Sequence, residues 1–326
     1  MEKNEKSSTD NGNEQVESLK VLILGSGPAG LSAALYAARA DLDPIVLTGM
    51  ELGGQVSLTF AVENYPGFPD GIGGMELVDL FQKQAERFGA RLEYDLATEA
   101  DLSERPFKVK TQNGKLYLAE TLIISTGASA IHLDVPGENE FIGRGVSYCA
   151  TCDGWFFKDK EVIVVGGGDS AVEESLFLTR YADNVTIVHR RDELRAGALL
   201  SERAKSNPKI GFAWNTVVKE ITGNGAVQNV KLQDTQTGEE RDKEIDGVFI
   251  FIGHSPNTSL FKDQLEMDDL MYIVVDHLMQ TSVPGVFAAG EVADSHFRQV
   301  ITSAGMGAAA AIQANHFLEE HPLDSD

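Results

Sequence analysis

The stretch LKVLILGSGPAGLSAALYAARA, residues 19–40, decides the fold of this chain. It runs from an apolar segment through a glycine-rich turn into an alanine-rich segment. Gly25, Gly27 and Gly30 within it form the pattern Gly-x-Gly-x-x-Gly. The first glycine of such a pattern permits a tight turn, the second lets a pyrophosphate approach the backbone, and the third lets helix and strand pack closely. The stretch therefore predicts a strand, a turn and a helix that bind a dinucleotide.

The residues around this turn support the prediction but leave the nucleotide open. Pro28 suits the first turn of a helix, where its missing N–H costs nothing, and the free N–H groups of that turn can face phosphates. A second apolar strand follows at residues 43–49. The usual fingerprint ends this strand with an acid that binds the ribose hydroxyls. Here that region holds Thr48, Gly49 and Met50, with Glu51 just beyond.

The same pattern recurs in EVIVVGGGDSAVEESLFLTRYADNVTIVHRR, residues 161–191. The places of the three glycines are taken by Gly166, Gly168 and Ala171. Each unit is followed downstream by an apolar strand that ends in glycine, TLIISTGA at 121–128 and GVFIFIGH at 247–254. Four matching segments in matching order favour duplication of a nucleotide-binding module over two coincidental glycine-rich turns.

The second unit favours NADPH. Its second strand ends in HRRDELRA, which supplies His189, Arg190, Arg191 and Arg195 in place of a carboxylate. Planar guanidinium groups suit a 2′-phosphate. The alternative is a solvated basic patch beside the carboxylates of Asp192 and Glu193. Three arginines at one place in so acidic a chain favour the nucleotide phosphate.

A third glycine-rich segment covers residues 281–314. A short apolar strand ends at Gly290, and Glu291, Arg298 and Gln299 precede a helix rich in alanine and glycine. Small residues let a helix approach a bulky ligand closely, although they also suit a tightly packed helix. The acid directly after the strand favours a contact with a ribityl or ribose group.

The only two cysteines lie in CATCDG, residues 149–154. Two cysteines are not a disulfide scaffold, so they form a redox or a metal-binding pair. A Cys-x-x-Cys pair can cycle between disulfide and dithiol, and its spacing commonly lowers the pKa of one thiol. A structural zinc site needs four ligands, and the 7 histidines show no partner spacing. A redox pair and no metal are therefore expected.

Composition narrows the remaining possibilities. The formal charge of −23 argues against nucleic acid, because it repels phosphates. No apolar run approaches the length needed to cross a bilayer. Residues 1–18 are polar, lack the apolar core of a signal peptide and are not Arg-rich, so we expect a disordered tail and a cytoplasmic protein.

With these motifs in place, the chain closely resembles the low-molecular-weight thioredoxin reductases. The matching features run in order from Leu19 to about Leu318. They are GSGPAG, GGQ (53–55), ENYPGFP (63–69), STGA, CATCDG, GGGDSAVEE, HRR with the later RA, GHSPNT (253–258) and GVFAAGEVADSHFRQ (285–299). The combination is far more specific than any single motif.

The resemblance implies an α/β fold with two Rossmann-like domains. The FAD domain is discontinuous, over residues 19–127 and 258–326, and follows the tail at 1–18. The NADPH domain, over residues 128–257, is inserted between the two parts and carries the cysteine pair. The family also implies a homodimer.

The implied activity is transfer of electrons from NADPH through FAD and the Cys149–Cys152 disulfide to thioredoxin or a similar small dithiol protein. By resemblance, Cys152 faces the flavin, Cys149 exchanges with the partner, and Asp153 is the acid that moves a proton. The implied FAD contacts are Ser26, Gly27, Pro28, Ala29, Thr48, Gly49, Gly54, Gln55, Asn64, Thr126, Gly127, Gly290, Glu291, Arg298, Gln299 and Val300. The implied NADPH contacts are Gly166, Gly168, Asp169, Ser170, His189, Arg190, Arg191, Arg195 and Gly253.

One residue departs from the family pattern. The family usually has aspartate where this chain has Glu291, which carries one more methylene. Reductases of the same fold that take electrons from ferredoxin or another flavin also resemble this chain around CATC, but they lack the arginines of the second unit. Two further alternatives remain. The enzyme could reduce a different small dithiol protein, or the chain could be a flavoprotein that only senses redox state.

Overall fold

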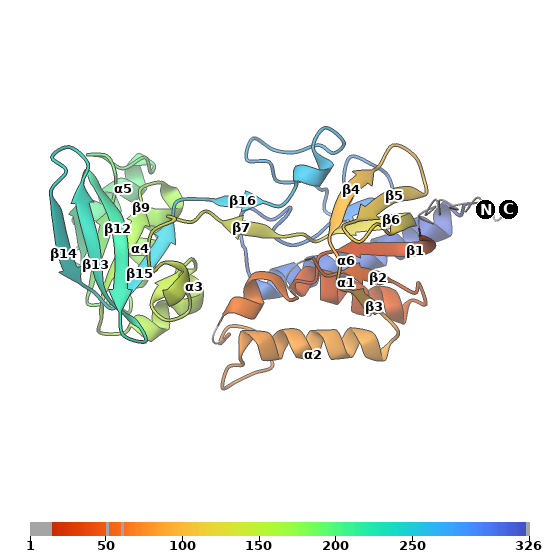
Figure 1. Ribbon diagram of the computed structural model, residues 1–326, viewed down its shortest axis with the longest axis horizontal. Coiled ribbons are helices and arrows are strands. Elements are labelled where there is room, and N and C mark those ends of the chain that lie inside the picture. The colour runs from red at the N-terminus through yellow and green to blue at the C-terminus, as the bar shows by residue number, and fades with distance from the viewer. Residues whose placement is uncertain (1–14, 50–51, 60–61, 324–326) are drawn as a thin grey trace, which may run out of the picture. The chain divides into compact units, whose positions relative to one another are not determined.

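The computed structural model describes residues 15–49, 52–59 and 62–323. The chain forms two compact units, and Figure 1 labels most of their helices and strands. The first unit is assembled from Met1–Gly54, Val78–Gly127 and Pro256–Asp326, and the second from Gln55–Leu77 and Ala128–Ser255. Two short strands, β7 (Ala128–Ala130) and β16 (His254–Pro256), pair where the chain passes between the units.

The first unit is built on a sheet of 7 strands in the order β3-β2-β1-β6-β5-β4, with β17 beside β6. Its parallel strands are β1 (Val16–Leu24), β2 (Ile45–Leu47), β3 (Arg91–Glu93), β6 (Leu116–Ile124) and β17 (Val286–Ala288). The antiparallel edge is β4 (Ala97–Asp101) and β5 (Phe107–Thr111). The helices are α1 (Pro28–Arg39), α6 (Val300–Glu320) and α2 (Gly74–Arg87), of which α2 begins in the second unit. The short 3₁₀ helices are η4 (Ser259–Phe261) and η1 (Gly54–Leu58), of which η1 passes into the second unit at Gln55.

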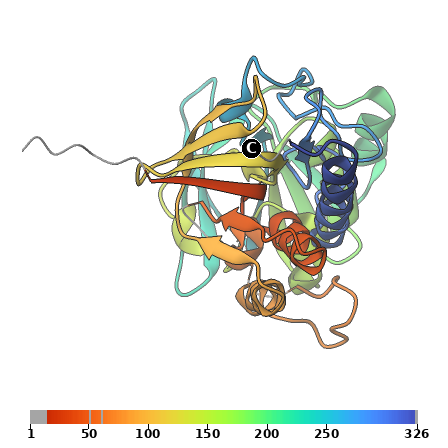
Figure 2. The same ribbon diagram turned by 90° about the vertical axis from the view of Figure 1, so that its right-hand side faces the viewer.

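The apolar run of β1 is buried on both faces, as expected of a central parallel strand. Val21 and Ile23 point into a core with α1 and α6, whereas Leu22 and Leu24 point into a core with β5 and residues 261–292. Figures 1 and 2 show α1 and α6 side by side against the sheet. The glycine-rich turn that follows β1 is therefore anchored on both faces of the sheet.

The expected end of the N-terminal tail differs from the structure. Most of residues 1–18 lies outside the described residues, but β1 begins at Val16, before the expected boundary at Ser18. Val16, Glu17 and Ser18 pair in parallel with Leu116–Leu118 of β6. Polar residues can join a strand because backbone pairing does not depend on an apolar side chain, so composition placed the boundary too late.

The second unit repeats the design of the first. Its 5 parallel strands lie in the order β11-β10-β9-β15-β8. They are β8 (Val146–Ser147), β9 (Glu161–Gly166), β10 (Asn184–Val188), β11 (Ile210–Ala213) and β15 (Gly247–Phe251). An antiparallel sheet of β12 (Thr216–Gly223), β13 (Val227–Asp234) and β14 (Glu240–Glu244) covers one face, and α4 (Asp169–Leu178) and α5 (Ala198–Ser206) cover the other. The short helices are α3 (Ala150–Asp153), η2 (Asn139–Phe141) and η3 (Gly154–Phe157).

The order β3-β2-β1-β6 in the first unit matches β11-β10-β9-β15 in the second. In each, a glycine-rich turn leaves the central strand and enters a helix. The prediction of two Rossmann-like units, one inserted into the other, is confirmed. Among the described residues, no helix is both long enough and apolar enough to cross a membrane.

A buried carboxylate, that of Glu138, holds Tyr148, the residue directly before the cysteine pair. Glu138 is 1% exposed, and its Oε1 accepts hydrogen bonds from the Leu133 N–H at 2.9 Å and the Tyr148 hydroxyl at 2.7 Å. The His132 Nδ1 lies 3.5 Å from the same oxygen. Burial and the bond to Glu138 raise the pKa of Tyr148, so its hydroxyl remains a donor. Tyr148 directly precedes Cys149.

Replacing Glu138 with alanine should lower the free energy of unfolding by about 2–4 kcal/mol, because two partly buried donors, the Leu133 N–H and the Tyr148 hydroxyl, lose their acceptor. Urea unfolding followed by circular dichroism measures the change. The matched control is Glu138→Gln, which keeps an acceptor oxygen and should lose less. Equal unfolding midpoints for wild type and Glu138→Ala would show that these bonds add nothing to stability.

Candidate active site

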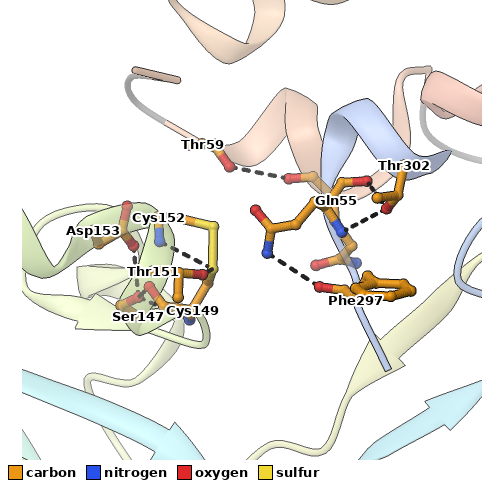
Figure 3. The surroundings of a disulfide bond; sticks show 10 residues. Gln55, Thr59, Ser147, Cys149, Thr151, Cys152, Asp153, Phe297 and Thr302 are labelled. Atoms are coloured by element: carbon orange, nitrogen blue, oxygen red, sulfur yellow. Dashed lines mark hydrogen bonds between the residues drawn. A yellow bond between two sulfur atoms is a disulfide. The ribbon is translucent and has the colours of Figure 1, made fainter. Parts of the chain in front are cut away.

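The two cysteines form a disulfide with an S–S distance of 2.09 Å (Figure 3). Cys149 is the N-cap of α3 and Cys152 lies within that helix. Both are partly exposed, and the Cys152 N–H points to the Cys149 Sγ at 3.2 Å. The spacing of the pair places both sulfurs on one turn, where they can open and close with little movement of the backbone.

Asp153, the last residue of α3, lies against the end of β8. The Ser147 hydroxyl donates to the Asp153 Oδ2 at 2.6 Å (Figure 3). Burial raises the pKa of Asp153, and the bond from Ser147 opposes this rise. A carboxyl with a raised pKa can carry a proton closer to neutral pH, which is what a proton donor beside a thiol requires. No sequence motif pointed to Ser147, because the two residues meet only through the turn between them.

The three glycines of the first glycine-rich turn differ in the space around them. Gly25 has φ +106°, and a Cβ there would lie 2.3 Å from the Ser125 carbonyl oxygen. A Cβ on Gly30 would lie 1.9 Å from the Gly25 carbonyl oxygen. A Cβ on Gly27, the N-cap of α1, would meet nothing within 4 Å. The first and third glycines thus serve packing, and the second leaves room for a ligand at the start of the helix.

Several predicted cofactor contacts also hold the fold together. The Ser26 hydroxyl donates to the Thr48 carbonyl oxygen at 3.0 Å and accepts the Gly53 N–H at 3.2 Å. The Gly49 N–H bonds the Asp95 carbonyl oxygen at 3.1 Å. Ser26 and Thr48 are buried. These bonds tie the end of β2 to the glycine-rich turn.

The other predicted contacts of this part of the chain lie in short segments. A Cβ on Gly54 would lie 3.7 Å from the Gly27 Cα, so these two glycines are close. Gln55 lies in η1, and Asn64 lies in an exposed bend of the stretch that groups with the second unit. Met50 and Glu51 are outside the described residues.

The glycines around α6 fit helix packing as well as ligand approach. A Cβ on Gly290 would lie 2.9 Å from the Ala29 Cβ, and one on Gly307 would lie 2.0 Å from the Ala29 carbonyl oxygen. A Cβ on Gly305 would meet nothing within 4 Å. The alternative of a tightly packed helix therefore explains Gly307, while Gly305 lies beside open space.

Glu291 lies directly after Gly290, in an acidic and mostly buried position. Burial raises its pKa to about 6, Arg298 opposes the shift and Asp294 adds to it. Asp294 accepts the backbone N–H groups of His296 at 3.0 Å and Phe297 at 2.8 Å. The sequence analysis did not single out Asp294. Its place in GEVAD, three residues after Glu291, could have indicated a second acid at this position.

The start of α6 uses Gln299 as a cap. The Gln299 side chain accepts a backbone N–H of the first turn, and the Thr302 hydroxyl receives the Gln299 N–H at 3.3 Å. Val300 is the first residue of the helix, and Arg298 before it has φ +53°. Tyr272 is 3% exposed, and its hydroxyl has no hydrogen-bond partner among the described residues. Its environment includes the charges of Glu291 and Arg298.

Thr126 and Gly127 are bonded to the segment after β16. The Thr126 hydroxyl donates to the Asn257 carbonyl oxygen at 2.7 Å, and the Asn257 Nδ2 donates to the Thr126 carbonyl oxygen at 2.9 Å. The Asn257 N–H bonds the Gly127 carbonyl oxygen at 2.9 Å. Asn257 belongs to the quoted motif GHSPNT but was not among the predicted contacts.

The second glycine-rich turn repeats the division of the first. A Cβ on Gly166 would lie 2.4 Å from the Phe251 carbonyl oxygen and 2.7 Å from the Ala171 Cβ. Gly168 is the N-cap of α4, and the nearest atom to a Cβ there is the Arg195 Nη2 at 4.0 Å. The open glycine of this turn therefore lies beside one of the predicted phosphate-binding arginines.

Three hydrogen bonds hold residues 195–197, in the loop that follows β10 and carries the arginines, against this turn. The N–H groups of Arg195 and Ala196 bond the Gly167 carbonyl oxygen at 2.7 and 3.1 Å. The Gly197 N–H donates to the Asp169 Oδ1 at 2.7 Å, so this predicted ligand holds the loop. The exposed side chains near the turn include Asp169, Ser170, Arg190, Arg191, Asp192, Glu193 and Arg195.

His189 differs from the arginines that follow it. It is 4% exposed, and its Nε2 has no hydrogen-bond partner in the part of the chain that the structure describes. Burial and the charges of the neighbouring arginines lower its pKa, so the ring is neutral at pH 7. Gly253 ends the equivalent glycine segment after β15, with a Cβ position 3.0 Å from the Ile131 Cδ1.

Comparison with known proteins gives consistent relatives. Residues 19–307 match the family model described as pyridine nucleotide-disulphide oxidoreductase. A curated thioredoxin reductase of Rickettsia felis is 52% identical over 305 residues, which cover 92% of this chain and 98% of that protein. One from Mycolicibacterium smegmatis is 50% identical over 301 residues, covering 92% and 96%.

Solved structures agree with these relatives. A thioredoxin reductase from Streptococcus pyogenes matches with a TM-score of 0.89 at 45% identity, covering 93% of this chain and 99% of that one. A thioredoxin reductase from Giardia duodenalis matches with a TM-score of 0.88 at 40% identity, again covering 93% and 99%.

Proposed function

The chain belongs to the pyridine nucleotide-disulphide oxidoreductases and, among them, to the thioredoxin reductases, and from this premise we propose that it reduces a thioredoxin with NADPH through FAD. The net reaction is NADPH, a proton and a protein disulfide giving NADP⁺ and a dithiol. The observation that carries the proposal is the Cys149–Cys152 disulfide in a chain with two nucleotide-type glycine turns.

The family uses a flavin and a nicotinamide nucleotide, and we assign FAD to the first unit. Gly27 offers open space at the start of α1, where backbone N–H groups favour a pyrophosphate. The buried Tyr272 hydroxyl and Glu291 supply polar groups for the ribityl end. When bound, the flavin accepts a hydride from the nicotinamide and passes two electrons to a disulfide.

NADPH is assigned to the second unit. Gly168 offers the same open position at the start of α4, and Arg195 lies beside it. Exposed Arg190 and Arg191 add positive charge for the 2′-phosphate. The His189 Nε2, which has no hydrogen-bond partner among the described residues, offers a polar atom next to them. These arginines are also the reason why a ferredoxin-type donor is not favoured.

The cysteines divide the exchange between them. The Cys152 N–H near the Cys149 Sγ favours a thiolate at Cys149. That thiolate attacks one sulfur of the thioredoxin disulfide, and the second thioredoxin sulfur leaves and takes a proton. The Cys152 thiolate then attacks the Cys149 Sγ, which restores the Cys149–Cys152 disulfide and releases the first thioredoxin sulfur. Asp153 holds the proton that such steps take up and release.

Exposed aromatic residues support a protein as the acceptor. Trp155 and Phe156 follow the cysteine pair and are 54% and 38% exposed. Trp155 contacts the Tyr181 ring edge-on, with centroids 5.8 Å apart. Aromatic side chains commonly anchor protein interfaces. We also propose a homodimer in the cytoplasm, where thiols stay reduced.

Steady-state oxidation of NADPH tests the proposal. A bacterial thioredoxin in its disulfide form should be required for continuous turnover, and thiols should appear on it at the rate at which NADPH disappears. NADPH oxidation that is independent of thioredoxin would contradict the proposed acceptor.

Substitutions of Glu291 test the assigned FAD site. Glu291→Ala should bind FAD roughly ten- to a hundredfold more weakly, since a charge-assisted hydrogen bond contributes about 1.5–3 kcal/mol. Glu291→Asp is the control and should bind FAD nearly as well as wild type. FAD release in mild denaturant measures both. If Glu291→Ala holds FAD as tightly as wild type, Glu291 is not a ligand.

The same residue predicts a pH dependence of FAD binding. Hydroxyl donors of FAD favour the charged form of Glu291, whose pKa is about 6 before binding. Binding therefore lowers this pKa, and the affinity for FAD should rise as pH increases through 6. Fluorescence titration of the apoprotein with FAD measures the affinity on both sides of this value. A Glu291→Gln variant with the same pH dependence would assign it to another group.

A further inference from the structure

We propose that Ser147 is a positioning residue of the disulfide exchange, which keeps Asp153 satisfied in both its charged and its protonated form. The inference rests on the proposed role of Asp153 as the proton carrier. It concerns the turn of β8 and α3 in the second unit, where Ser147 and Asp153 meet (Figure 3).

Two acceptors lie within hydrogen-bond distance of the single hydroxyl proton of Ser147. The side chain is almost completely buried, with 4% of the residue exposed. Its Oγ lies 2.6 Å from the Asp153 Oδ2 and 3.2 Å from the Cys149 carbonyl oxygen, both of which are acceptors. The Cys149 N–H donates to the same Oγ at 3.1 Å. The hydroxyl thus contacts the proton carrier and the backbone of the exchanging cysteine at once.

These contacts satisfy either protonation state of Asp153. When the carboxyl is charged, the Ser147 hydroxyl donates to its Oδ2. When it is protonated, it donates to the Ser147 Oγ, and the serine proton turns to the Cys149 carbonyl oxygen. The Oγ then accepts two bonds and donates one, which is the full capacity of a hydroxyl. Only protons have to rearrange between the two states, and no buried polar group loses its partner.

Charge from elsewhere does not explain the state of Asp153. Its pKa is raised by burial and lowered by the bond from Ser147. The neighbouring helix α4 carries Asp169, Glu173 and Glu174, and none of these shifts the pKa of Asp153. The other titratable groups on α3 and at its cap are the two cysteines, once the disulfide is open. Removing the serine hydroxyl therefore leaves burial unopposed.

The test compares Ser147→Ala with Ser147→Thr, which keeps a hydroxyl. In Ser147→Ala the pKa of Asp153 should rise by about one unit or more, because the charged form loses its donor. Ser147→Thr should stay close to wild type. Carbon-13 NMR of carboxyl-labelled aspartate in the holoenzyme follows the titration, with Asp153→Asn identifying the signal. The pH profile of thioredoxin reduction should shift in the same direction.

Controls separate a role in proton transfer from a role in folding. Ser175 in α4 is also buried, and its hydroxyl donates to a backbone acceptor, the Ala171 carbonyl oxygen, at 2.6 Å. Ser175→Ala should leave the pH profile unmoved. If Ser147→Ala does not fold, Ser147→Val, which has the shape of the threonine control without its hydroxyl and suits a strand, is measured in its place.

The outcomes distinguish a failure of the role of Ser147 from a failure of the proposed role of Asp153. An unmoved Asp153 pKa in the hydroxyl deletion, with Asp153→Asn inactive, overturns the role of Ser147 alone. Wild-type thioredoxin reduction by Asp153→Asn overturns the role of Asp153 and, with it, the catalytic meaning of the pair. A raised pKa in Ser147→Ala, restored in Ser147→Thr, supports the inference.

Discussion

Replacing either Cys149 or Cys152 with serine is expected to abolish the reduction of thioredoxin, by on the order of a thousandfold or more, because each sulfur performs a step that oxygen cannot. Without Cys149 no thiolate attacks the partner disulfide. Without Cys152 the mixed disulfide with the partner is not resolved. Each variant should still transfer a hydride from NADPH to the flavin, since the proposed nucleotide sites use other segments of the chain.

The two halves of this prediction are measured separately. Anaerobic stopped-flow absorbance follows flavin reduction by NADPH, and a thiol assay follows thioredoxin reduction. Thr151→Ser, between the two cysteines, keeps the hydroxyl that lies 3.4 Å from the Cys149 Sγ, so as the matched control for disturbance of α3 it should keep both activities. Retained thioredoxin reduction in either serine variant would be fatal to the proposed exchange.

Arg190→Ala and Arg195→Ala should each lower the preference for NADPH over NADH by roughly ten- to a hundredfold. A charge-assisted contact to the 2′-phosphate contributes about 1.5–3 kcal/mol, and about 1.4 kcal/mol is a factor of ten. The loss should appear as a higher KM for NADPH, while NADH is affected little because it lacks that phosphate. Steady-state kinetics with both nucleotides measures the ratio.

A surface arginine outside this loop provides the control. Arg203 in α5 is exposed in the same unit, and Arg203→Ala should keep the wild-type preference. If the variants of Arg190 and Arg195 also keep it, these arginines do not bind the phosphate. A different electron donor would then become the better account of the second unit.

The fold could be predicted because short, local patterns determine it. The apolar runs of β1 and β9 are buried on both faces. Gly25 and Gly166 occupy positions where a Cβ would collide with the backbone of Ser125, just after β6, and of Phe251 in β15. Such constraints leave a signature in neighbouring residues. The start of β1 at Val16 left none, because its polar residues are held by backbone pairing with β6.

The site was less predictable where a side chain serves the fold as well as a ligand. Ser26, Asp169 and Gln299 fit the family motifs, but in the structure they bond a turn, a loop and a helix end. Ser147 was missed because its bond to Asp153 depends on the geometry of the turn between them. The setting of Glu291, with Asp294 beside it, likewise follows from tertiary packing.

The most direct test of the whole account is to follow the Cys149–Cys152 disulfide itself. The purified holoenzyme is reduced anaerobically with NADPH, divided, and alkylated before or after addition of oxidised thioredoxin, and labelled cysteines are identified by mass spectrometry. We predict that NADPH exposes both thiols, and that thioredoxin restores the disulfide while gaining two thiols of its own. A disulfide that stays closed although NADPH reduces the flavin, or thiols that persist after thioredoxin is added, would contradict the account.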